Sequence, residues 1–93
     1  LAGNDDFQDT INQLTTKKLR TKLLVVERII QNDSPKVEFV LESLLEGKVF
    51  YIKSNKKVVY AIKENKEYLA KDLLNGNSFG KFSKRQLKKV GIN

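Results

Sequence analysis

The spacing of apolar residues changes at Gly47, and this change constrains the fold more than any other feature. Before Gly47, apolar residues recur every three or four positions, as on one side of an α-helix. From Lys48 onward the period is two, and β-branched and aromatic residues dominate, which is typical of β-strands. We therefore expect one α+β domain over 1–93, with a helical part at 1–47, an antiparallel β part at 48–82, and a short helix and tail at 83–93.

The helical part is expected to be a helical hairpin or three-helix unit whose helices carry apolar stripes. Asn4 or Asp5 can cap the first helix, and Thr15 or Thr16 can cap the second. The stripe of the first helix is Phe7, Ile11 and Leu14. The stripe of the second is Leu19, Leu23, Val26 and Ile30, widened by Leu24, Val25 and Ile29. A stripe this wide predicts apolar neighbours on more than one side of the second helix, which should end near 31–33.

The third helix has the clearest start, with Ser34 as its N-cap and Pro35 at its first position, where a missing N–H costs nothing. Its stripe is Val37, Val40, Leu41, Leu44 and Leu45. Gly47 should close this helix in the left-handed conformation, because glycine adopts it without steric cost. The sheet that follows is expected to lay its apolar face over the helices.

The sequence pattern of the β part predicts two hairpins. Val49 and Tyr51 should share one face of the first strand, and Phe50 and Ile52 the other. After a turn at 54–56, Val58, Tyr60 and Ile62 should alternate with Val59 and Ala61. A turn at 64–66 leads to a short strand at 67–71, and Asn75-Gly76 is a strong hairpin signal. Ser83 should then cap a last helix, KRQLKKV, that ends at Gly91.

The composition argues against an enzyme. Cysteine and histidine are absent, so disulfides, the usual zinc ligands and Cys or His catalytic groups are excluded. Asp5, Asp6 and Asp9 lack the ligand spacing of a calcium loop and suit a helix N-terminus instead. The Ser83 and Lys84 pair has no visible oxyanion site, and the glycines are not spaced as a phosphate loop. We expect no catalytic residue, no cofactor and no metal site.

The positive charge is concentrated in the second half of the chain. Residues 1–47 hold six Lys and Arg against eight Asp and Glu, whereas residues 48–93 hold twelve against three, so their net charges are −2 and +9. Such asymmetry indicates an anionic partner, with general solubility as the plainer explanation. The candidate partner-contact surface is Lys48, Tyr51, Lys53, Lys56, Lys57, Tyr60 and Lys63.

A basic ribbon with interleaved aromatic residues can also bind nucleic acid. Several of these lysines, however, fall at strand ends and turns, where lysine ordinarily protects sheet edges from pairing with other chains. The basic half contains a single arginine, Arg85, although arginine is the preferred reader of bases and phosphates. Nucleic acid is therefore the less favoured partner.

The order of three passages, LESLLEGKVFYIKSNKKVV, KDLLNGNSFGKF and LKKVGIN, resembles the N-terminal extension of the permease subunit of bacterial urea ABC transporters, relatives of the branched-chain amino-acid permeases. Two residues depart from that pattern. Asn75 stands where the family has threonine, and Ile92 stands where the family tends to have a polar residue. The positions that carry the resemblance are Leu44, Leu45, Gly47, Tyr51, Lys53, Asn55, Lys57, Val58, Val59, Asp72, Leu74, Gly76, Gly80, Leu87, Lys88, Lys89, Val90 and Asn93.

The resemblance implies an extracytoplasmic (periplasmic) accessory domain of a membrane protein, with membrane spans after Asn93. Its partners would be the solute-binding protein, the other permease subunit, or both, and its work would be docking or bracing for the transport of urea or related amides. The longest aliphatic run here, 23–26, is far shorter than the about 20 residues of a membrane helix, and the start without methionine fits a processed or excised segment. A small basic nucleic-acid-binding module is the alternative.

Overall fold

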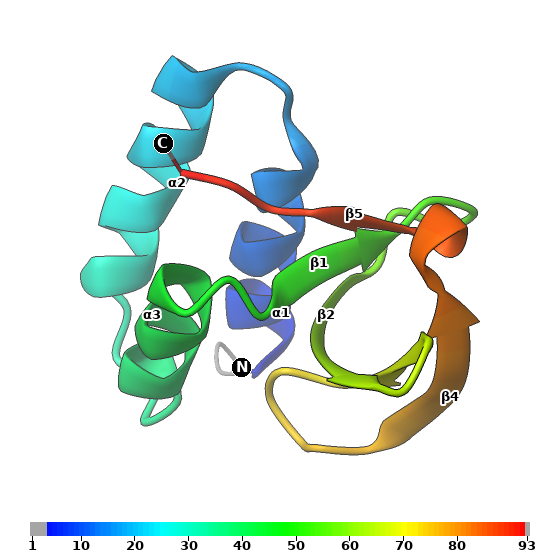
Figure 1. Ribbon diagram of the computed structural model, residues 1–93. Helices are drawn as coiled ribbons and strands as arrows, with labels where there is room; N and C mark the ends of the chain where they lie inside the picture. The colour runs from blue at the N-terminus through cyan, green and yellow to red at the C-terminus, as the bar shows by residue number, and fades with distance from the viewer. Residues whose placement is uncertain (1–3, 93) are drawn as a thin grey trace.

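The computed structural model of the protein describes residues 4–92, which form three helices followed by a five-stranded antiparallel sheet (Figure 1). The expected α+β class is confirmed. The elements in chain order are α1 (Asn4–Asn12), the 3₁₀ turn η1 (Gln13–Thr15), α2 (Leu19–Ile30), α3 (Val37–Leu45), β1 (Val49–Ile52), β2 (Val58–Glu64), β3 (Glu67–Lys71), β4 (Ser78–Ser83), the 3₁₀ turn η2 (Lys84–Gln86) and β5 (Leu87–Lys89). Within residues 4–92, no helix has the length and apolar character of a membrane span.

The first two helices begin close to the expected positions. The stripe of Phe7, Ile11 and Leu14 is buried, as its spacing predicts. The side chains of Asn4 and Asp5, which were expected to cap α1, lie outside the described part of the chain. The expected cap of α2 by a threonine is wrong, because the helix begins at Leu19 with Lys18 in the N-cap position.

The buried side of α2 differs from the expected stripe. Val25 and Ile29 are the buried residues, whereas Leu19, Leu23 and Ile30 are exposed. The apolar residues of α2 encircle most of the helix, so spacing alone does not say which side faces the core. Helix α2 packs against α1 and α3, and Lys22 on α2 donates to the Gly91 carbonyl of the C-terminal segment at 2.7 Å.

Helix α3 ends as the sequence indicates, but its expected start is wrong, because Lys36 and not Ser34 is the N-cap and Pro35 lies in the turn before the helix. The Ser34 hydroxyl accepts a hydrogen bond from the Lys36 N–H at 3.1 Å, although the regular helix begins two residues after Pro35, at Val37. At its end, Gly47 has φ +72, and its N–H donates to Leu44 while the Lys48 N–H donates to Ser43. This pair of bonds is a Schellman motif, so the expected glycine stop is confirmed.

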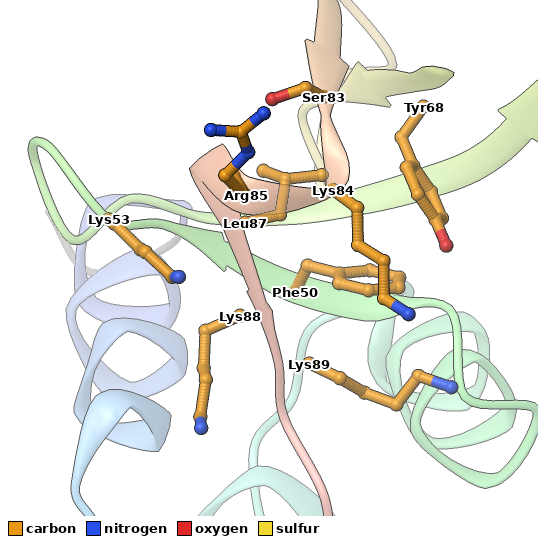
Figure 2. Close-up of a pocket in the computed structure, with 9 residues that line it drawn as sticks. All are labelled: Phe50, Lys53, Tyr68, Ser83, Lys84, Arg85, Leu87, Lys88 and Lys89. Atoms are coloured by element: carbon orange, nitrogen blue, oxygen red, sulfur yellow. The ribbon is translucent and has the colours of Figure 1, made fainter. Parts of the chain in front are cut away.

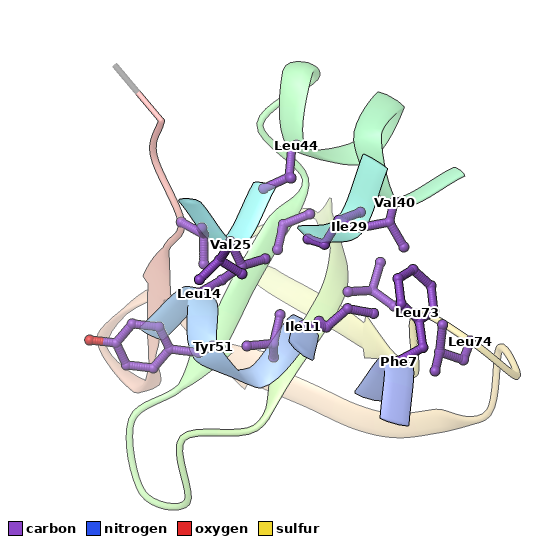
Figure 3. Packing of buried hydrophobic residues seen from close by; sticks show 13 residues of the cluster. Phe7, Ile11, Leu14, Val25, Ile29, Val40, Leu44, Tyr51, Leu73 and Leu74 are labelled. Atoms are coloured by element: carbon purple, nitrogen blue, oxygen red, sulfur yellow. The ribbon is translucent and has the colours of Figure 1, made fainter. Parts of the chain in front are cut away.

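The sheet has the strand order β4-β3-β2-β1-β5 and two apolar faces, each with its own core. Val49, Tyr51 and Val58 pack with the helices in the larger cluster (Figure 3). The opposite face curls around a smaller cluster made of Phe50, Ile52, Val59, Ala61, Ala70 and Leu87. The alternation expected for β1 and β2 is therefore confirmed, but only one of the two faces lies over the helices.

The turns between strands follow the expected positions. Asn65 has φ +58 in the tight turn between β2 and β3, and Gly76 has φ +75 in the loop between β3 and β4. That loop, 72–77, is longer than a two-residue hairpin. It is closed by the Asp72 N–H donating to Asn77 and by the Gly76 N–H donating to Asp72.

The expected C-terminal helix after Ser83 is wrong. Only the single 3₁₀ turn η2 forms, and the chain then continues as β5, which pairs antiparallel with β1 through Tyr51↔Lys88 and its neighbours. The extended backbone buries Leu87 in the smaller cluster and Val90 in the larger one. A helix over the same residues would leave the edge of β1 without a partner, so tertiary pairing overrides local helix propensity here.

Candidate functional site

An open groove with basic walls lies on the outer side of η2 and β5, with a volume of about 620 Å³ (Figure 2). Its size is within the range of ligand pockets in proteins. Nine residues line it: Phe50, Lys53, Tyr68, Ser83, Lys84, Arg85, Leu87, Lys88 and Lys89.

The floor of the groove is apolar and belongs to the smaller core cluster. Leu87 and Phe50 are 5% and 8% exposed, and Tyr68 packs against them half-buried. The rings of Phe50 and Tyr68 lie 5.3 Å apart at a tilt of 55°. The floor is therefore held in place by the packing of the sheet, and Tyr68 offers the most accessible aromatic surface.

Four lysines flank β5 in two pairs. In Figure 2, Lys84 and Lys89 extend to the side of β5 on which Phe50 and Tyr68 lie, and Lys53 and Lys88 extend to the other side. Lys88 and Lys89 point to opposite sides because successive side chains of a strand alternate. The Lys89 ammonium lies 5.7 Å from the centre of the Phe50 ring, so it stands directly over the apolar floor.

The backbone of η2 is fixed at both ends. The Ser83 N–H donates to the Gln86 Oε1 at 2.8 Å, and the Lys53 N–H donates to the Gln86 carbonyl at 2.9 Å. The second bond ties the turn after β1 to η2. It thereby holds Lys53 beside the cations of η2, Lys84 and Arg85.

The five cations of the groove carry uncompensated charge. No acidic residue lines the groove. The ion pairs found within residues 4–92 join Lys48 to Glu46, Lys57 to Asp72 and Lys81 to Glu64, so none involves a groove cation. Clustered like charges repel each other, and an anionic ligand would relieve that repulsion.

The residues expected to form a partner-contact surface do not all lie together. Lys53 alone reaches the groove. Tyr51 is buried on the helix side of the sheet under Lys56, whose ammonium lies 5.0 Å from its ring centre. Tyr60 packs on the same side against Phe39, with ring centres 5.2 Å apart.

The other lysines of the expected surface lie elsewhere on the sheet. Lys57 pairs with Asp72, and Lys63 is exposed near the end of β2. Lys48 pairs with Glu46 at 3.3 Å, and the hydrogen bond and negative charge of this carboxylate raise the pKa of Lys48. The strands thus distribute these side chains over both faces of the sheet.

Sequence reasoning missed most of the groove because it assigned 84–90 to a helix. The signal was present in the sequence: Lys84, Arg85, Lys88 and Lys89 fall within six residues. Leu87, at the centre of this run, is the residue that anchors it to the core. A basic run with one buried apolar residue fits a short edge strand as well as a helix.

Comparison of the chain with known protein families, with curated proteins and with solved structures found no match. Within residues 4–92, no group of three or more Asp or Glu side chains is arranged to hold a metal ion. The groove of η2 and β5 is thus the surface whose chemistry is most distinctive: cationic side chains around a small apolar floor.

Proposed function

We propose that this chain is a non-catalytic extracytoplasmic accessory domain of an ABC importer permease for urea or related amides, and that it acts by contacting another protein of the transporter. The observation that carries the proposal is the residue-by-residue resemblance to the extension of the urea permeases, read together with the position of those residues in the fold.

The residues of the resemblance include those that set the stop of α3, the loop after β3 and the irregularity in β4. Gly47, Gly76 and Gly80 all have positive φ, a conformation that favours glycine. Asp72 organises the loop after β3, since its Oδ1 accepts hydrogen bonds from the N–H groups of Leu74 and Asn75. Shared residues at such positions support a shared fold, which is the first requirement of the proposal.

The charge of the groove supports a docking role. Cations that are not paired within the protein attract an acidic surface over distances of about 10 Å at moderate ionic strength. Two of the groove cations, Lys88 and Lys89, belong to the resembling LKKV passage. Lys53, which the resemblance also includes, is held beside them by its bond to Gln86.

The test is direct binding to the solute-binding protein of the same transporter. The domain is titrated with that protein in low salt by calorimetry, and with the other permease subunit in detergent. We expect association with at least one of them that weakens as salt is added. Absence of association with both, or a parent reading frame without apolar runs of about 20 residues after Asn93, would contradict the proposal.

Nucleic-acid binding is a second candidate, favoured by the grouping of Arg85 with four lysines beside Tyr68. The low exposure of Phe50 counts against it, because a ring that is 8% exposed has little face available for a base to stack on. Electrophoresis with a single-stranded oligonucleotide distinguishes the two. Retention that disappears steeply with salt would favour the nucleic-acid module.

A further inference from the structure

Strand β5 has one free edge. It is the last strand in the sheet order and pairs only with β1. The Lys53 N–H donates to Gln86, and the Val90 N–H donates to Val49, so Gln86, Lys88 and Val90 direct their backbone groups toward β1. By the same alternation, the N–H and C=O of Lys89 and the C=O of Leu87 point away from β1.

The free edge is flanked by cations on both sides. Lys84 and Lys89 lie on the side of the apolar floor, and Lys53 and Lys88 lie on the opposite side (Figure 2). The side chains of an added strand would alternate between these two sides. Acidic residues at successive positions would therefore meet one lysine pair and then the other.

We propose that the free edge of β5 binds an acidic segment of a partner protein in extended conformation, as an additional antiparallel or parallel strand. Backbone hydrogen bonds to Lys89 and Leu87 would set the register, and carboxylates would pair with the flanking lysines. An aliphatic side chain of the segment would lie on Leu87 and Tyr68. The identity of the partner rests on the proposed function, but the chemistry of the segment does not.

Two features favour a peptide over other polyanions. The lysine pairs are separated by a strand edge that presents two C=O groups and one N–H; the C=O groups can accept hydrogen bonds from the N–H groups of a peptide, whereas an ionised phosphodiester has no proton to donate to them. The floor between them has room for an aliphatic side chain but shows little open aromatic surface for a base. A lysine-flanked edge resists pairing with further copies of this basic chain, so it is selective for acidic strands.

The test titrates the whole domain with a short synthetic peptide of alternating Glu and Val and follows amide hydrogen exchange by NMR. We expect the peptide to slow exchange of the Lys89 amide, which has no partner in the free sheet. The Lys88 amide already bonds to β1 and should change little. Binding that leaves exchange at Lys89 unaltered would overturn the strand addition.

Charge variants test the flanking lysines. The double variant Lys84→Glu with Lys89→Glu should weaken peptide binding by about tenfold or more, because it reverses the charge on one side of the edge. The matched control, Lys36→Glu with Lys66→Glu, lowers the net charge equally at two exposed residues that do not line the groove, and it should change the affinity by less than about threefold. Equal losses in both would show that only net charge matters and would overturn the proposal.

A backbone variant and two other probes complete the test. Lys89→Pro removes the N–H that points away from β1, so peptide binding should be lost while the circular dichroism of the sheet is retained. If this variant does not fold, the hydrogen exchange of the Lys89 amide in the unaltered domain still tests the strand addition. Tighter binding to an oligonucleotide or to phosphatidylglycerol vesicles than to the peptide would contradict the choice of partner. These outcomes do not depend on whether the transporter proteins bind.

Discussion

The ammonium Nζ of Lys57 lies 3.6 Å from the carboxylate Oδ2 of Asp72 and thereby joins the start of β2 to the loop after β3. The Asp72 side chain is 10% exposed, so solvent screens this pair less than an ordinary surface pair. The other oxygen, Oδ1, accepts the Leu74 N–H at 2.8 Å and the Asn75 N–H at 3.1 Å. One carboxylate therefore holds both the loop and its attachment to β2.

Replacing Asp72 should separate these two roles. Asp72→Asn keeps an oxygen that can accept the loop hydrogen bonds but loses the ion pair, and we expect a loss of about 1 kcal/mol in the free energy of unfolding. Asp72→Ala also leaves the two N–H groups without an acceptor and should cost about 2 to 3 kcal/mol. Urea denaturation of both variants measures the difference. Equal losses would mean that the loop bonds contribute nothing.

Gly76 provides a test of backbone conformation with a control in the same chain. Its φ of +75 is strained for any residue with a Cβ, although no atom lies within 4 Å of the place where a Cβ would stand. Gly76→Ala should therefore cost about 1 kcal/mol through conformation alone. Gly91→Ala has the same open space without a positive φ and should change the stability by less than about 0.5 kcal/mol. Thermal unfolding of both variants makes the comparison.

The parts of the fold that could be predicted are those that depend on neighbours in the sequence. The Gly47 stop follows from the conformation that only glycine adopts freely, and the two faces of β1 follow from the alternation of Val49, Phe50 and Tyr51. The change of apolar spacing at Gly47 also depends only on neighbouring residues, so it could be used to separate the helices from the strands.

The parts that could not be predicted depend on distant partners. Helix α2 is apolar on several sides, and the packing of α1 and α3 decides that Val25 is buried and Leu23 is exposed. Residues 84–90 have helix-forming side chains, but only the turn η2 forms at 84–86, and Leu87–Lys89 pair with the edge of β1 as β5. The groove was missed for that reason, because its cations meet Phe50 and Tyr68 only after β5 has formed.

The pair of Lys48 and Glu46 predicts a pH dependence at alkaline pH. The hydrogen bond that the Lys48 ammonium donates to the Glu46 carboxylate raises the pKa of Lys48 above that of an unfolded chain, which is about 10.4. The stabilisation from this pair is therefore complete below that pH and is lost as the pH rises through the raised value. Glu46→Gln should lower the pKa of Lys48 toward the ordinary lysine value in an NMR titration of its side-chain carbons. An unchanged pKa in the variant would exclude Glu46 as the cause.

Leu87 should be essential to the docking of β5, because its side chain is 5% exposed and fills the smaller core beside Phe50 and Ile52. Leu87→Ala leaves a cavity there, and we expect a loss of about 2 to 4 kcal/mol in the free energy of unfolding. The control is Leu45→Ala, since that leucine is 78% exposed and its truncation should change the stability by less than about 0.5 kcal/mol.

Hydrogen exchange in the same variants distinguishes local from global loss. If β5 detaches before the sheet unfolds, Leu87→Ala should release the amides of Lys88 and Val90, which bond to β1, while the amides between β2 and β3 stay protected. Such a result would also remove the edge on which the peptide is proposed to bind. If a helix formed at 84–90 instead of β5, these two amides would show helical shifts and no contacts to Val49 or Tyr51, and the assignment of the groove would be wrong.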